Sequence, residues 1–300
     1  MVDSTGPGAP ERGNWGRWGA DDERGAANLV TPEVVKSAMA SVRTGEVLSL
    51  ALPIDGSTSS PQGRRVPHIA GRPLPQHFMS IDGGDYAAGA RKLRGDMGMS
   101  DDALAHVWRG ERLYNGHSET DVRSNGARRC GIDKLGPIVT RGVLLDVAGY
   151  LSVDALAPDV LIDADLLSLV AESAGVLPGR GDVVLIRTGW VETWDGDAAR
   201  FSGRQPGLDH SGVQWLLERD VVAIGADNIA VGAIDEAGGF WGSVDEDVHL
   251  TALWAYGAPL LEMLRLDELA RRGRSDFLFS VAPLPVVGGT ASPVAPTVVL

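Results

Sequence analysis

Three short runs of aliphatic and β-branched residues, at positions 143–147, 183–187 and 221–224, most constrain the fold of this 300-residue chain. Each run is apolar along almost its whole length, which is typical of strands buried on both faces of a sheet. Segments with the spacing of amphipathic helices, at 163–174 and 213–219, lie between the runs. Strands mixed with helices throughout the chain predict one α/β domain, at 14–300, built on a mixed sheet.

Capping residues and composition predict several boundaries. Thr31 and Pro32 have the residue types preferred at the N-cap and at the first position of a helix, and Asp163 is expected to cap another helix. The Gly-, Pro- and Ser-rich stretch 54–85 is expected to be a long loop. Further strands are expected within 47–53, 277–282 and 296–300, a helix near 248–256, and a strand pair at 138–147 that is interrupted at Arg141 and Gly142.

Composition excludes several classes of protein. The formal net charge of −13 argues against a nucleic-acid partner, because phosphates require a basic face. No apolar run approaches the ~18 residues that a membrane span needs. A single cysteine, Cys130, cannot form an internal disulfide, which favours a cytoplasmic protein. Residues 1–13 lack a basic start and an apolar stretch, so they predict a flexible N-terminal tail instead of a signal peptide.

The chemistry of the chain is concentrated between Asp96 and His106. Within these eleven residues lie three carboxylates, the hydroxyl of Ser100 and an imidazole. If 96–100 forms a helical turn or tight loop, Asp96 and Ser100 share a face. If 100–106 is extended, Ser100, Asp102 and His106 point the same way. In either case the side chains are expected to converge. Taken alone, the carboxylates can also be read as an ordinary acidic turn at the surface.

The same segment resembles the signature of the kynurenine formamidase-like cyclase family, which reads His-x-Gly-Thr-His-x-Asp-x-Pro/Leu-x-His. Gly98, Asp102, Leu104 and His106 fit this pattern. The resemblance covers nearly the whole chain and is similar to the larger branch of the family, through the segments 18–23, 113–116, 141–146, 187–190 and 288–293. It implies the swivelling β/β/α fold, metal-dependent hydrolysis of cyclic amides, formamides or lactones, and assembly as a homodimer or larger homo-oligomer.

The chain departs from the signature at its two metal-binding histidines, which are replaced by Asp96 and Ser100. The replacement removes the imidazole ligands that zinc favours, whereas oxygen ligands suit Mg²⁺ and Mn²⁺. By the resemblance, Glu262 stands where the larger branch has a glutamate near the metal. A cluster of Asp96, Asp102 and Glu262 is therefore expected to bind a divalent metal weakly, with Mg²⁺ or Mn²⁺ favoured over Zn²⁺, or the metal site is lost.

Proton transfer is the second predicted chemistry of the site. His106 closes the signature, and His249 lies where the family has a second active-site histidine. Histidines exchange protons near neutral pH, and two of them beside carboxylates can divide the acid and base roles. Asp102 is expected to orient His106.

Aromatic and loop side chains are candidates for the substrate-binding surface. Trp18 and Trp108 are expected to line a pocket for a flat substrate, and His77 and Phe78 are expected to form its wall just upstream of the signature. The alternative for the N-terminal tryptophans is a structural cap on the core or on a partner subunit. His210 is expected at the start of a surface helix, and Cys130 to be structural.

Three functional hypotheses follow from the sequence. The first is a small-molecule enzyme that cyclises or modifies a cyclic or aromatic, polyketide-type substrate by acid–base catalysis through His106 and His249, with a degenerate metal site. The second is a divalent-metal-dependent hydrolase of a cyclic amide, formamide or lactone. The third is a catalytically silent binding protein on the same scaffold.

Overall fold

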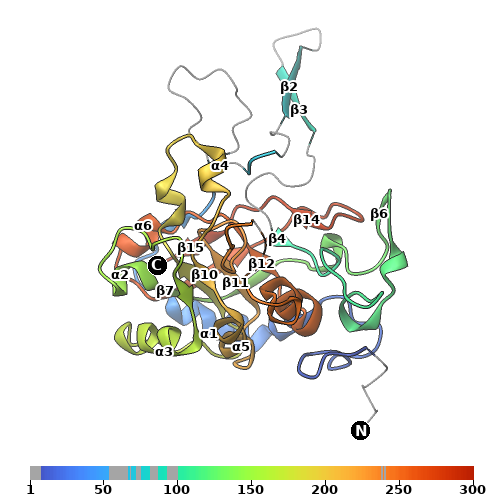
Figure 1. Ribbon diagram of the computed structural model, residues 1–300, viewed down its shortest axis with the longest axis horizontal. Helices are drawn as coiled ribbons and strands as arrows, with labels where there is room; N and C mark the ends of the chain where they lie inside the picture. The colour runs from blue at the N-terminus through green and yellow to red at the C-terminus, as the bar shows by residue number, and fades with distance from the viewer. Residues whose placement is uncertain are drawn as a thin grey trace.

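The computed structural model describes residues 8–53, 67, 69–71, 101–237, 239 and 241–300, together with the backbone of two strands at 76–81 and 87–92. A nine-stranded mixed sheet forms its centre, in the order β1-β15-β13-β7-β9-β11-β12-β4-β14 (Figure 1). The bounds of these strands, in that order, are Val47–Ser49, Thr297–Val299, Asp276–Val281, Ile138–Asp146, Val183–Arg187, Ala223–Ala226, Leu260–Leu261, Asp101–Asp102 and Ala291–Ser292. The predicted mixed α/β architecture is therefore confirmed.

Four neighbouring strands of this sheet, β7, β9, β11 and β12, run parallel to one another. The other pairings in the sheet are antiparallel, including β12 with β4 and β4 with β14. Because β4 pairs with the last parallel strand, the short segment after β12 and the residues of β4 lie side by side. This junction positions the candidate site.

Helices cover the sheet, and three small two-stranded sheets lie outside it. In Figure 1, α3 and α5 lie next to each other below the central strands, and α1 packs against β7. The α-helices are α1 (Pro32–Ala38), α2 (Val147–Tyr150), α3 (Ala164–Ser173), α4 (Ala198–Phe201), α5 (His210–Leu217) and α6 (Asp267–Arg271). The 3₁₀-helices are η1 (Gly25–Leu29), η2 (Met39–Ser41), η3 (Tyr114–Gly116), η4 (Glu119–Asp121), η5 (Ile132–Lys134), η6 (Trp190–Thr193) and η7 (Val244–Glu246), and η8 (Leu250–Tyr256) is a π-helix.

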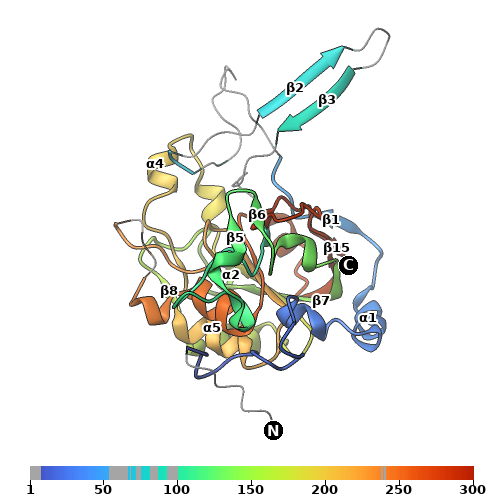
Figure 2. The same cartoon turned by 90° about the vertical axis from the view of Figure 1, so that its right-hand side faces the viewer.

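The small sheets pair β2 (Gln76–Ile81) with β3 (Ala87–Lys92), β5 (Val122–Arg123) with β6 (Gly126–Ala127), and β8 (Leu161–Ile162) with β10 (Gly207–Leu208). Figure 2 shows the β2–β3 hairpin standing apart from the body of the molecule. The prediction of a continuous loop over 54–85 is therefore wrong at 76–81, where cross-strand pairing with β3 overrides the composition.

Several predicted boundaries agree with the structure. The side chain of Thr31 accepts a hydrogen bond from the backbone N–H of Val34, and Asp163 caps α3 by accepting from Leu166 N–H at 2.8 Å. The predicted break in the strand at 141–142 is wrong, because β7 continues through both residues. At Gly142 the backbone of β7 lies close to the Phe277 ring of the neighbouring strand. A Cβ atom at this position would lie 2.1 Å from the ring, so only glycine fits there.

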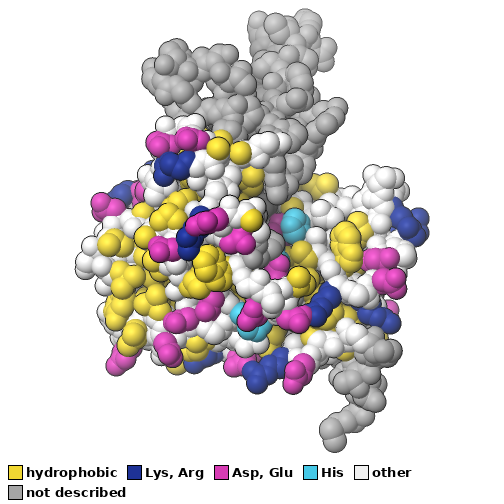
Figure 3. Space-filling view, viewed as in Figure 1, with side chains coloured by type: hydrophobic (Ala, Val, Ile, Leu, Met, Phe, Trp, Pro, Cys, Tyr) yellow, Lys and Arg dark blue, Asp and Glu magenta, His cyan; other side chains and the backbone are white. Residues whose placement is uncertain are grey.

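Charges of both signs are distributed over the surface of the described parts (Figure 3). On the face drawn in Figure 3, acidic side chains are interspersed with arginine and lysine, and the coloured side chains form no continuous basic patch. None of the helices in the described segments combines the length and the apolarity needed to cross a bilayer.

Asp101 is a buried carboxyl group inside this fold. Its side chain is fully buried, and neither carboxylate oxygen accepts a hydrogen bond within the described part of the chain. Burial raises the pKa of Asp101 well above its usual value, and the charge of Asp102 raises it further. Folding therefore favours the protonated form of Asp101 relative to the unfolded chain.

We expect Asp101→Val to stabilise the protein by about 1–3 kcal/mol at pH 7, because it removes a buried polar group that has no hydrogen-bond partner among the described residues. The wild-type free energy of unfolding is expected to fall as pH rises above about 4, since only the unfolded chain releases this proton there. Asp101→Asn, which cannot ionise, is expected to lack this dependence. Urea unfolding from pH 4 to 8 measures both effects, and a Val variant less stable than wild type across this range contradicts them.

Candidate active site

Asp102 is placed by the pairing of β4 with β12 and β14. Asp101 lies opposite Leu261 in β12 and Ser292 in β14, and side chains of adjacent strand residues point to opposite faces of the sheet. Asp102 and Glu262, which follow the paired residues Asp101 and Leu261, therefore project from the opposite face of the sheet. Asp102 is almost fully buried there, with 2% of its side chain exposed.

A turn of the backbone after Asp102 brings the His106 side chain close to Asp102. The backbone N–H of His106 donates to the carbonyl of Ala103 at 2.9 Å, and the three residues between Asp102 and His106 are buried. This turn brings His106 Nδ1 to 3.7 Å from Asp102 Oδ1. The His106 side chain is 32% exposed, so the ring contacts a buried carboxylate on one side and remains accessible on the other.

His249 and Glu262 approach the same carboxylate from the other side. His249 immediately precedes η8, and Glu262 immediately follows β12. His249 Nε2 lies 3.3 Å from Glu262 Oε1 and 3.7 Å from Asp102 Oδ2. The His106 and His249 ring centroids are 6.1 Å apart. The two histidines and Asp102, predicted together from the sequence, are therefore adjacent in space.

Asp247 fixes the start of the helical segment that carries His249. Its carboxylate accepts hydrogen bonds from the backbone N–H groups of His249, at 2.7 Å, and Leu250, at 3.1 Å. The sequence interpretation missed this role, although an aspartate just before a helical turn is a recognised capping signal.

The protonation state of His249 follows from its surroundings. Burial lowers the pKa of His249, and the charges of Asp102 and Asp247 oppose part of that shift. The neutral imidazole is therefore favoured at neutral pH. Neutral imidazole is also the form of histidine that coordinates metals.

Asp102, His249 and Glu262 together form a set of potential metal ligands. One ligand atom from each residue lies within 4.8 Å of the other two. Two carboxylates and one neutral imidazole are a donor set that divalent cations accept in proteins, so these residues fit an ion. His249, assigned to proton transfer from the sequence, thus joins two of the predicted ligands, while Asp96 and Ser100 lie outside the described residues.

Trp108 and Trp18, predicted to line a pocket, lie outside the group formed by Asp102, His106, His249 and Glu262. Trp108, two residues beyond His106, is 52% exposed. Trp18 lies beneath the Arg17 guanidinium, at 4.9 Å, and packs against the main core. His77 and Phe78 are in the backbone of β2, and their side chains lie outside the described part of the structure.

Two further predictions away from the site agree with the structure. Cys130 is fully buried, and burial raises the pKa of its thiol, as expected of a structural cysteine. His210 is the first residue of α5, with Asp209 as the N-cap.

Comparisons with known proteins place this chain in a family. Residues 90–233 match the model of the Cyclase family, described as "Putative cyclase". A solved structure described as a novel cyclase is 31% identical, with a TM-score of 0.85, and the alignment covers 97% of this chain and 98% of that one. The chain belongs to the cyclase family. The cyclase family inferred from the signature is therefore confirmed, while the likeness to kynurenine formamidases and to the larger branch stays a prediction.

More distant structures share the fold of this cyclase-family protein. An isatin hydrolase bound to the product analogue thioisatinate is 20% identical, with a TM-score of 0.63 and coverage of 90% of this chain and 99% of that one. A "predicted metal-dependent hydrolase" from Bacillus stearothermophilus is 17% identical, with a TM-score of 0.53 and coverage of 84% and 97%. No curated protein matches the sequence. The family membership points to an enzyme.

Proposed function

We propose that this cyclase-family protein is a divalent-metal-dependent hydrolase of a cyclic amide, a formamide or a lactone. The observation that carries the proposal is the convergence of Asp102, His249 and Glu262 within 4.8 Å, with His106 on the other oxygen of Asp102. Isatin hydrolases, which share the fold, provide a precedent for hydrolysis of a flat cyclic substrate on this scaffold.

The chain's own residues divide into two roles in this proposal. Asp102, His249 and Glu262 would hold the cation, with Mn²⁺ or Mg²⁺ favoured because two of the three candidate ligands are carboxylates. When bound, the cation would polarise a substrate carbonyl and lower the pKa of water. His106 transfers the proton, because it is the accessible imidazole and Asp102 orients it through Nδ1.

A second candidate is metal-independent acid–base cyclisation of an aromatic substrate. The observation in its favour is that Asp102 lies 3.7 Å from both imidazoles, an arrangement able to move a proton without a cation. One set of assays distinguishes the two candidate functions. Hydrolysis of a panel of cyclic amides, formamides and lactones that stops on chelation and returns with Mn²⁺ supports the first. Full hydrolysis in chelated protein contradicts the first, and cyclisation of an aromatic substrate in chelated protein supports the second.

We expect Glu262→Gln to weaken Mn²⁺ binding about tenfold or more, because the amide cannot replace a charged ligand that faces His249 at 3.3 Å. For the wild type, Mn²⁺ at about 100 times its dissociation constant is expected to add about 2.7 kcal/mol to the free energy of unfolding. Calorimetric titration and thermal unfolding with and without Mn²⁺ measure these effects. Glu236→Gln, which changes an exposed carboxylate paired with Arg204, is the control. Equal Mn²⁺ affinity in all three proteins contradicts the assignment.

A further inference from the structure

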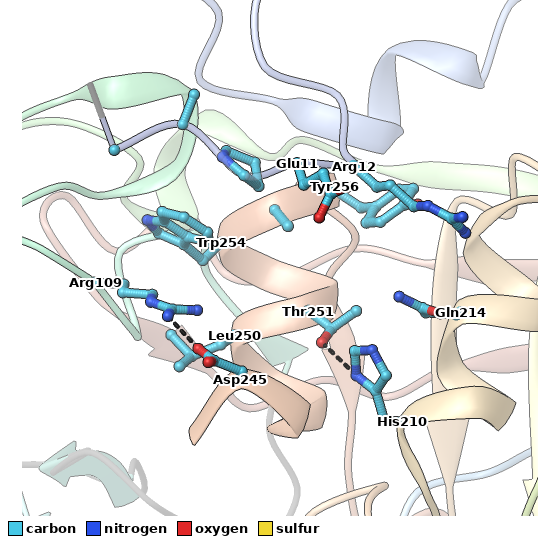
Figure 4. Close-up of a pocket in the computed structure, with 14 residues that line it drawn as sticks. Glu11, Arg12, Arg109, His210, Gln214, Asp245, Leu250, Thr251, Trp254 and Tyr256 are labelled. Carbon is cyan, nitrogen blue, oxygen red and sulfur yellow. Dashed lines mark hydrogen bonds and ion pairs between the residues drawn. The ribbon is translucent and has the colours of Figure 1, made fainter. Parts of the chain in front are cut away.

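The two active-site histidines lie on segments that are far apart in the sequence and are joined beside a surface groove. The segment after His106 ends in a tight turn, in which Arg109 and Arg112 exchange backbone hydrogen bonds of 2.9 and 3.0 Å. The other segment runs from η7 through His249 into η8. Figure 4 shows where side chains of the two segments meet.

Trp254, five residues after His249, contacts the His106 segment twice. Its indole N–H donates to the carbonyl of Arg112 at 2.9 Å, and the Arg109 guanidinium lies over its ring, 5.8 Å from the centroid. Trp15 packs against Trp254. The two rings lie edge to face with centroids 5.0 Å apart, and the Trp15 indole N–H donates to the Trp254 carbonyl at 2.7 Å. With only 5% of Trp254 exposed, the ring is fixed in one orientation.

An ion pair adds a second connection between the same segments. Arg109, three residues after His106, pairs with Asp245, four residues before His249. Both side chains are solvent-exposed, so the pair itself contributes little to stability. The same guanidinium lies over the Trp254 ring, so the Arg109 side chain contacts the His249 segment at two points.

We propose that Trp254 is a positioning residue, which acts with Arg109 to hold His106 at its distance from His249 and Asp102. His106 needs such support, because its ring is partly exposed and its contact with Asp102 is 3.7 Å long. A displacement of about 1 Å in a catalytic group can lower turnover by about a hundredfold. The consequence for turnover rests on the proposed function, whereas the geometric role does not.

The groove supplies a matched control for this proposal. Its volume is about 710 Å³, with Arg109 and Asp245 on the side of the histidine segments. On the opposite side, Arg12 forms an exposed ion pair with Glu218. That pair connects the N-terminal segment to the end of α5, and neither of its members belongs to a segment that carries an active-site histidine.

Three variants of the full chain test the proposal. Trp254→Phe keeps an aromatic face for Arg109 but loses the indole donor, Arg109→Ala removes the stacking and the ion pair, and Arg12→Ala is the control. The readout is the nuclear Overhauser effect between the ring protons of His106 and His249 in histidine-labelled protein. We expect it to weaken in the first two variants and to keep its wild-type intensity in Arg12→Ala.

Unchanged ring-to-ring intensity in Arg109→Ala overturns the proposal, and this variant remains informative if Trp254→Phe fails to fold. Weakening of the same size in Arg12→Ala also overturns it, because the effect is then not specific to the histidine segments. With an identified substrate, we expect kcat to fall about tenfold to a hundredfold in Arg109→Ala with little change in KM. If ring contact is lost while kcat is unchanged, the positioning role stands and the proposed proton transfer by His106 fails.

Discussion

Asp102→Asn is expected to lower turnover about a thousandfold and to abolish Mn²⁺ binding at concentrations that saturate the wild type. The reason is that one carboxylate serves the whole site: Oδ1 faces His106, Oδ2 faces His249, and the group belongs to the ligand set with Glu262. An amide has the same shape but no charge, so it removes the electrostatic contribution while leaving the packing nearly intact. Steady-state kinetics and calorimetric Mn²⁺ titration measure the two losses.

The neighbouring aspartate provides the control for this experiment. Asp101 is equally buried, but it projects from the opposite face of β4, away from the two histidines. Asp101→Asn is therefore expected to keep wild-type Mn²⁺ affinity and most of the turnover. Equal losses in the two variants would show that the effect arises from disturbing β4 and not from removing a charge at the site.

His106→Asn is expected to lower turnover by about 10²–10⁴-fold while leaving Mn²⁺ affinity within about twofold of the wild type. His249→Asn is expected to lower both, because its Nε2 lies between the carboxylates of Asp102 and Glu262. The contrast follows from exposure: the His106 ring is accessible, whereas the His249 ring is buried and favours its neutral form.

The same kinetic and calorimetric measurements on both variants check this division of roles. Loss of Mn²⁺ binding in His106→Asn would place both imidazoles at the cation. Retained binding in His249→Asn would remove His249 from the ligand set and leave Asp102 and Glu262 as the candidate ligands.

Two residues of the candidate site could be predicted from the sequence because they belong to a local signature. Asp102 and His106 lie four positions apart, and a short turn is enough to bring them together. His249 and Glu262 came from the family resemblance, and the structure places both beside Asp102. What the sequence could not show is that His249 faces both carboxylates, because this depends on how η8 packs beside the end of β12.

The parts that were missed depend on contacts between distant segments. Arg109 and Asp245 are 136 positions apart, and neither has a local pattern that indicates the other. The continuous course of β7 through Gly142 is fixed by the Phe277 side chain of the neighbouring strand, which a single-strand pattern does not contain. Likewise, β2 forms by pairing with β3, although its surroundings have the composition of a loop.

Anomalous diffraction from crystals equilibrated with Mn²⁺ shows whether Asp102, His249 and Glu262 hold one cation. We expect one strong anomalous peak within coordination distance of Asp102 Oδ2, His249 Nε2 and Glu262 Oε1, and no such peak in crystals of Glu262→Gln. A peak elsewhere, or none at these three atoms at saturating Mn²⁺, contradicts the proposed metal site.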